Sequence, residues 1–94
     1  MSISFPNPSR SYDPDRRRIR FWGHDSAMEV SFFLEESAIF ILYPKTKNTE
    51  AGILAAFDNA REIIFAVAAK IYAPGRYRRF YTLTGDQFSK VATT

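Results

Sequence analysis

The sequence predicts a fold of the α+β class, in which an antiparallel sheet of three or four strands carries one long helix across one face, together with one or two short helices. Three patterns lead to this prediction: a helical repeat over 49–73, two alternating segments on either side of 23–26, and a further alternating segment over 76–83. The expected order of elements is β-β-β-α-α-β-α, within a single compact domain that spans 1–94.

The segment 49–73 is the longest run of the chain without proline, and its apolar residues recur at helical spacing. Asn48 or Thr49 can cap the first turn, and Pro74 ends the helix. We therefore expect one continuous helix over this segment. Its main apolar face consists of Ile53, Phe57, Ala60, Ile64, Val67, Ala68 and Ile71.

A second apolar row runs along one flank of this helix and consists of Leu54, Phe65 and Tyr72, with Arg61 in the same row. The apolar arc is then wider than one neighbouring element needs, so we expect a further element or a second chain to cover it. These four residues are a candidate dimer or covering surface. Arg61 either ties the helix to the turn at Asp25 or extends along the core boundary as a snorkelling side chain, and the second is favoured.

Residues 17–22 and 27–34 alternate between apolar and polar side chains, which indicates two half-buried strands joined by a turn over 23–26. Because side chains repeat every two residues along a strand, the parity of the apolar positions decides which residues share the core face. The pairs expected from a turn centred at 24–25 are Phe21 with Met28, Ile19 with Val30, Arg20 with Glu29, and Trp22 with Ala27.

The remaining elements are shorter. Proline, asparagine and aspartate interrupt regular structure over 6–15, which we expect to be a loop or arm. Thr84 and Gln87 have the spacing of a capping box, so a short helix should follow them. The other expected elements are a strand over 3–5, a short helix over 35–43, a strand over 76–83, a helix over 85–91 and a frayed tail over 92–94.

The composition excludes several chemistries. The chain has no cysteine, one histidine and four glycines, and these glycines are isolated from one another. It therefore offers no thiolate nucleophile, no cysteine-ligated zinc and no glycine-rich phosphate loop. We expect no catalytic, cofactor-binding or metal-ligating residues. The first residues lack the apolar run of a signal peptide and no stretch has the roughly 20 apolar residues of a membrane span, so the expected compartment is the cytoplasm.

His24 stands next to Asp25 in the expected turn. A histidine oriented by a carboxylate is a typical general base. Adjacent side chains in a turn rarely point toward each other, however, and aspartate in a turn usually bonds to backbone N–H groups. A solvated turn pair is therefore the favoured interpretation.

The strongest functional signal is a set of arginines and aromatic residues on two predicted strands. If these strands are neighbours, the side chains share one patch, in which arginines neutralise phosphates and rings stack on bases. Exposed arginines also discourage edge-to-edge aggregation of strands. The net charge of +3 permits contact with nucleic acid without requiring it. The set consists of Arg16, Arg18, Arg20 and Trp22 on the earlier strand, and Arg76, Tyr77, Arg78 and Arg79 on the later one.

These patterns favour a small non-enzymatic protein-interaction or adaptor domain that forms a homodimer, since apolar residues on a nominally exposed face indicate a partner. The alternative is a small basic domain that binds nucleic acid through the arginine and aromatic residues. Neither a small-molecule substrate nor a membrane partner is expected.

Three segments carry a resemblance to a known family: FWGHDSAMEVSFF over 21–33, AAFDNAR over 55–61, and YTLTGDQF over 81–88. With them, the chain resembles, over nearly its whole length, the small bacterial proteins grouped as domain of unknown function 1488. The segment 39–48 departs from that pattern by being more apolar. The resemblance implies a single compact α+β domain. It implies no activity and assigns no functional residues.

Overall fold

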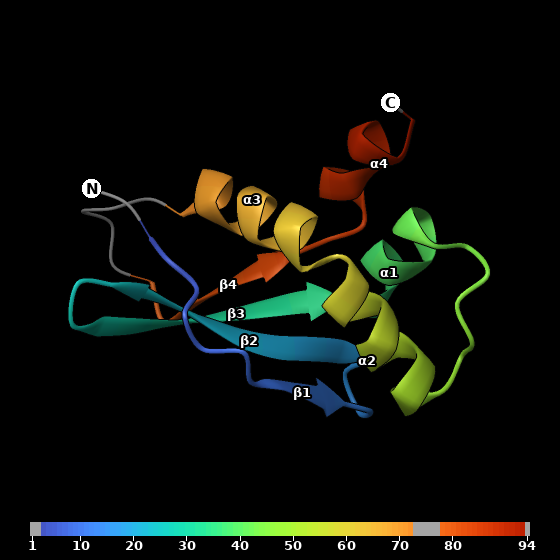
Figure 1. Cartoon of the computed structure of the whole chain (residues 1–94), viewed down its shortest axis with the longest axis horizontal. Helices are drawn as coiled ribbons and strands as arrows, with labels where there is room; N and C mark the ends of the chain where they lie inside the picture. The colour runs from blue at the N-terminus through green and yellow to red at the C-terminus, as the bar shows by residue number, and fades with distance from the viewer. Residues whose placement is uncertain (1–2, 73–77, 94) are drawn as a thin grey trace.

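The computed structural model describes residues 3–72 and 78–93. In these residues the chain forms one four-stranded sheet with the strand order β1-β2-β3-β4. The four-stranded α+β arrangement confirms the predicted fold class (Figure 1). The strands are β1 (Arg10–Asp13), β2 (Arg18–Asp25), β3 (Met28–Glu35) and β4 (Phe80–Leu83).

The helices lie together on one face of the sheet, and the opposite face carries none of them (Figure 1). They give the order β-β-β-α-α-α-β-α, which has one helix more than expected. The predicted short helix at 35–43 is present as α1. The helix α4 continues to Thr93, so residues 92 and 93 are not the frayed tail that was expected, and residue 94 lies outside the described residues. The helices are α1 (Glu36–Leu42), α2 (Glu50–Asn59), α3 (Arg61–Ile71) and α4 (Asp86–Thr93).

Strands β2 and β3 form the predicted antiparallel hairpin, but the predicted register is wrong. The turn is at Ser26 and Ala27, where Ser26 has a left-handed φ of 56°, and Phe21 pairs with Phe32. Gly23, which suggested a turn, lies inside β2. A Cβ atom there would lie 2.8 Å from the Cδ1 atom of Ile3, so close packing rather than chain reversal requires glycine.

Strand β4 pairs with β3 in parallel, so the expectation of a wholly antiparallel sheet is wrong. The physical reason is the connection between them. All three helices α1, α2 and α3 lie between β3 and β4 in the chain, and a helical crossover returns the chain to the end of the sheet from which β3 started. The described part of the predicted strand 76–83 begins at residue 78, and residues 76 and 77 lie outside the described residues.

The first residues also differ from the prediction. Arg10–Asp13, expected to be part of a loop over 6–15, form the edge strand β1 and pair with β2. The expected strand over 3–5 contributes only an isolated bridge between Ser4 and His24. A turn does follow β1, and the Asp13 carboxylate accepts a hydrogen bond of 3.0 Å from the backbone N–H of Asp15.

The predicted long helix is two helices. Thr49 caps α2 by accepting a hydrogen bond of 3.0 Å from the Gly52 N–H. At the other end the helix stops after Asn59, because Ala60 has φ −106° and ψ 11° and so leaves the helical conformation. Asp58 and Asn59 have low helix propensity, and the bend lets α2 and α3 each follow the twisted sheet (Figure 1).

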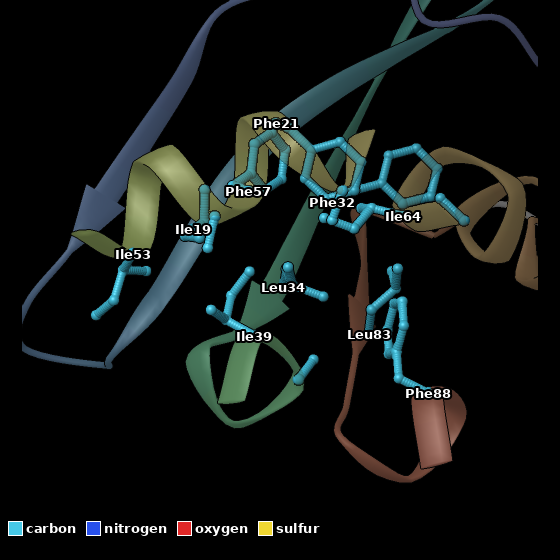
Figure 2. Packing of buried hydrophobic residues seen from close by; sticks show 14 of the residues in the cluster. Ile19, Phe21, Phe32, Leu34, Ile39, Ile53, Phe57, Ile64, Leu83 and Phe88 are labelled. Carbon is cyan, nitrogen blue, oxygen red and sulfur yellow. The ribbon is translucent and has the colours of Figure 1, made fainter. Parts of the chain in front are cut away.

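The core lies between the sheet and the helices, and aromatic rings form its centre (Figure 2). The rings of Phe21 and Phe32 lie on neighbouring strands with their centroids 5.3 Å apart. Phe57 from α2 packs against Phe21 at 5.4 Å. Each ring removes a large apolar area from water, so this cluster is the main source of stability. The largest fully buried side chains are Phe21, Phe32, Phe57, Phe88, Ile19, Leu34, Ile39, Ile53, Ile64 and Leu83.

Replacement of Phe5 by alanine is expected to lower the free energy of unfolding by about 2–3 kcal/mol, because the ring packs on Phe21, Phe32 and Phe65 and its removal leaves a cavity. Phe80→Ala is the matched control. The Phe80 ring is 47% exposed and meets only the edge of Phe33, so its loss should cost less than about 1 kcal/mol. Urea denaturation measures both. Equal losses would show that residues 3–9 do not belong to the core.

A candidate binding surface on the uncovered face of the sheet

The face of the sheet opposite the helices consists of the side chains that alternate with the core residues. On β2 the core takes Ile19 and Phe21, so Arg18, Arg20 and Trp22 project to the other side. We call the following set the uncovered face: Ser11 and Asp13 of β1, Arg18, Arg20, Trp22 and His24 of β2, Glu29, Ser31, Phe33 and Glu35 of β3, and Phe80 and Thr82 of β4.

Arginines and rings are in direct contact at the centre of this face. The guanidinium carbon of Arg18 lies 3.7 Å from the centroid of the Phe33 ring. The Arg20 guanidinium lies 5.1 Å from the Trp22 ring and donates a hydrogen bond of 3.0 Å to the Ser31 hydroxyl. Phe80 meets Phe33 edge to face, with centroids 5.3 Å apart. These contacts hold planar groups in a fixed arrangement at the surface.

Two rows of paired residues across the strands form the middle of the uncovered face, and neither row contains a carboxylate. The first row consists of Trp22, Ser31 and Phe80. The second row consists of Ser11, Arg20, Phe33 and Thr82.

The carboxylates of this face lie at its two ends. Asp13 and Glu35 both pair in register with Arg18, and the Arg18 Nε atom is 3.7 Å from the Asp13 carboxylate. At the hairpin end, the His24 Nε2 atom is 3.9 Å from the Glu29 carboxylate. The centre is therefore cationic and aromatic, whereas the ends carry more carboxylates than arginines: Asp13 and Glu35 flank Arg18 at one end, and Glu29 faces the histidine at the other.

The structure brings only part of the predicted arginine set together. Arg18, Arg20 and Trp22 share the uncovered face, whereas Arg16 is exposed in the turn between β1 and β2. Arg78 and Arg79 are exposed just before β4, which is separated from β2 by β3. The predicted residues Arg76 and Tyr77 lie outside the described residues.

The sequence placed Phe33 with Trp22 on the polar side of the hairpin, but Phe33, Phe80 and Ser31 were not among the predicted site residues. Phe33 and Phe80 were visible as the apolar residues that break the alternation of their strands on the polar side. What the pattern could not show is that β3 lies between β2 and β4 and so joins these residues to the arginines.

Comparison with known proteins agrees with this architecture. The family described as "Protein of unknown function (DUF1488)" matches residues 3–84. The chain belongs to the DUF1488 family. The chain is also similar to a solved DUF1488 protein of unknown function from Shewanella loihica PV-4, with a TM-score of 0.67, 21% identity, and coverage of 74% of this chain and 76% of that one. No curated protein matches the chain.

In this DUF1488 chain, the helix flank predicted as a dimer or covering surface meets residues of the same chain. The Phe65 ring stacks on Phe5 with centroids 4.4 Å apart. Arg61 donates a hydrogen bond of 2.7 Å to the Pro8 carbonyl oxygen. Leu54 and Tyr72 are partly buried against the core. The N-terminal segment thus covers much of this flank.

Arg61 does not reach Asp25, as one of the two interpretations required. It pairs instead with Asp58 at 2.7 Å, and Asp58 also receives two hydrogen bonds from Arg10 of β1. The hydrogen bonds from Arg10, together with Arg61, lower the pKa of Asp58 below its usual value. This cluster ties the edge strand to the end of α2.

Asp25 is bonded to Tyr72 of α3 and not to backbone groups of the turn. The carboxylate accepts from the Tyr72 hydroxyl, and this bond raises the pKa of Tyr72 to about 12. Since Asp25 is only 8% exposed, the tyrosine supplies the partner that a buried carboxylate needs. The predicted solvated pair of His24 and Asp25 is therefore wrong for Asp25.

An open depression beside the uncovered face is lined by Arg16, Arg17, Glu35, Glu36, Ser37, Phe40 and Ile41. The buried carboxylate of Glu36 accepts hydrogen bonds of 2.6 Å from Tyr12 and 2.8 Å from Arg17. Arg17 reaches it from a left-handed conformation with φ 54°. These contacts satisfy Glu36 and lock the turn after β1 to the start of α1.

Across residues 3–72 and 78–93, no three histidine, cysteine, aspartate or glutamate side chains gather as metal ligands would. Within the same residues, no helix has both the length and the apolar character needed to cross a membrane.

The stability of the chain should fall as the pH falls from about 5 to about 3, in part because of Asp58. A carboxyl group whose pKa is lower in the folded state stabilises the fold above its unfolded pKa and loses this contribution as it is protonated. Asp58→Asn should therefore flatten the dependence of the urea midpoint on pH. Glu62→Gln, which changes an exposed carboxylate at the start of α3, is the control. Identical slopes for both variants would contradict the role of Asp58.

Proposed function

We propose that this DUF1488 chain is a small non-enzymatic interaction domain, and that its contact surface is the uncovered face of the sheet. One observation carries the proposal: the helices leave this face open, and it holds arginines and aromatic rings in mutual contact. Aromatic residues and arginine are the residue types enriched at the centres of protein interfaces. A face that served only solubility would not need rings at its centre.

The distribution of reactive groups supports a role without catalysis. The Nε2 atom of the single histidine, His24, lies 3.9 Å from the Glu29 carboxylate near the tip of the hairpin. His24 is not among the residues that line the depression around Glu36. The buried carboxylates Asp25 and Glu36 are each held by hydrogen bonds from tyrosine or arginine side chains. General acid or base catalysis needs a group free to exchange a proton with a substrate, and these groups are engaged within the fold.

A second copy of the chain is one candidate partner. The uncovered face carries arginines and carboxylates together, and a homodimer through it would pair the cations of one copy with the anions of the other. Because the N-terminal segment covers much of the helix flank, the uncovered face is the better candidate for self-association.

If the chain forms a homodimer through this face, sedimentation velocity should show self-association over a hundredfold range of concentration. The emission of Trp22, the single tryptophan, should shift to the blue as the face is buried. Arg20→Glu should weaken the association, because it replaces a cation available to the carboxylates of the second copy by a further anion. Lys47→Glu, the same change of charge at an exposed loop position, should not.

A chain that sediments as a monomer at every concentration would contradict the homodimer. Self-association that Arg20→Glu leaves intact, with unchanged Trp22 emission, would contradict the assignment of the contact to the uncovered face.

A further inference from the structure

We propose that the uncovered face binds single-stranded nucleic acid. This inference rests on the proposed function, since it takes the same face as the contact surface, and it names the class of partner.

Three arginines on or beside the uncovered face, Arg16, Arg20 and Arg79, have no carboxylate partner among the described residues. Arg20 donates only to the Ser31 hydroxyl, and Arg16 and Arg79 are exposed. The exposed Arg78 is not part of this set, because its guanidinium group lies 5.7 Å from the ring of Tyr81, which faces the core. A folded protein gains little by leaving cations unpaired, but a phosphate backbone neutralises them and releases its counterions. Arginine also suits this role because its planar guanidinium group binds phosphate oxygens in pairs.

Arg16 and Arg79 lie toward opposite ends of the face, on either side of Arg20. Arg16 belongs to the turn after β1, at the end where β2 starts and β3 finishes. Arg78 and Arg79 precede β4, which runs parallel to β3, so they lie toward the opposite end. A single strand that crossed the face between these ends would pass over the two central rows and meet basic groups before and after them.

The central rows favour this partner over a second copy of the chain. They contain Arg20 and three aromatic residues but no carboxylate, since the carboxylates lie at the ends. A twofold axis through the middle of the face would place Arg20 near its own copy, and like charges in contact are unfavourable. A nucleic acid has no such conflict, because its phosphates bind the guanidinium group and its bases stack on the aromatic rings.

The rings present surfaces for stacking. Phe80 is 47% exposed and pairs with Ser31 from one side. Trp22 pairs with Ser31 from the other side and is half-buried. Arg18, held over the Phe33 ring at 3.7 Å, adds a further plane on which a base can stack. Bases expose their flat faces only when the strand is unpaired, so a surface of this kind selects single strands over duplexes.

The test uses the full chain and a labelled random single strand, with fluorescence anisotropy at low and high salt and with Trp22 quenching as a second signal. We expect binding at low salt that weakens as salt is added. Arg20→Glu should lower the affinity about tenfold or more, whereas Lys47→Glu should change it less than about threefold. Phe80→Ala should lower it about fivefold through lost stacking. Urea denaturation establishes that each variant is folded.

The outcomes separate this inference from the proposed function. No binding at low salt, equal losses for Arg20→Glu and Lys47→Glu, or equal affinity for a labelled duplex would each overturn the nucleic-acid assignment. If binding is absent but the chain self-associates through contacts that Arg20→Glu weakens, the proposed contact surface stands with a second copy as the partner. If binding is strong and only Lys47→Glu reduces it, both the nucleic-acid assignment to this face and the proposed contact surface fail.

Discussion

The packing of Phe21 and Phe32 under the helices is the interaction on which the rest of the structure depends. These two rings lie on the central strands, and rings from α2, α3, β4 and the N-terminal segment meet them directly or through one another. Because the core takes the side chains at alternate positions of the strands, the positions between them point to the other face and can carry polar and aromatic groups. The composition of the uncovered face is thus a consequence of how the core is built.

Much of this arrangement could be predicted from local pattern. Alternation in 17–22 and 27–34 placed Ile19 and Phe21 in the core, and the parity of the pairing was right even though the register was not. A register depends on where the chain turns, and that turn was set by contacts distant in sequence. Gly23 stays in the strand because Ile3 and Phe5 pack against it, and Asp25 is held by Tyr72.

The candidate site was predicted only in part for the same reason. Arg18, Arg20 and Trp22 follow from the alternation of one strand, whereas Phe33 and Phe80 join them only through the order of strands in the sheet. The parallel β3–β4 pair needs a crossover connection, which the helices between the two strands provide, but the sequence pattern does not show that these strands are neighbours. No glycine or proline marks the break between α2 and α3 at Ala60 in the sequence. The break results from the packing of the two helices on a twisted sheet.

The parallel pairing of β4 also sets an order on folding. The hairpin of β2 and β3 closes a short loop, whereas the pairing of β4 with β3 must close a connection that contains three helices, which costs more chain entropy. Until then the edge of β3 offers unpaired backbone groups beside Phe33, and an unpaired edge is a template for association with other chains. Pairing with β4 covers this edge, so β4 protects β3 from association with other chains in addition to its part in the finished sheet.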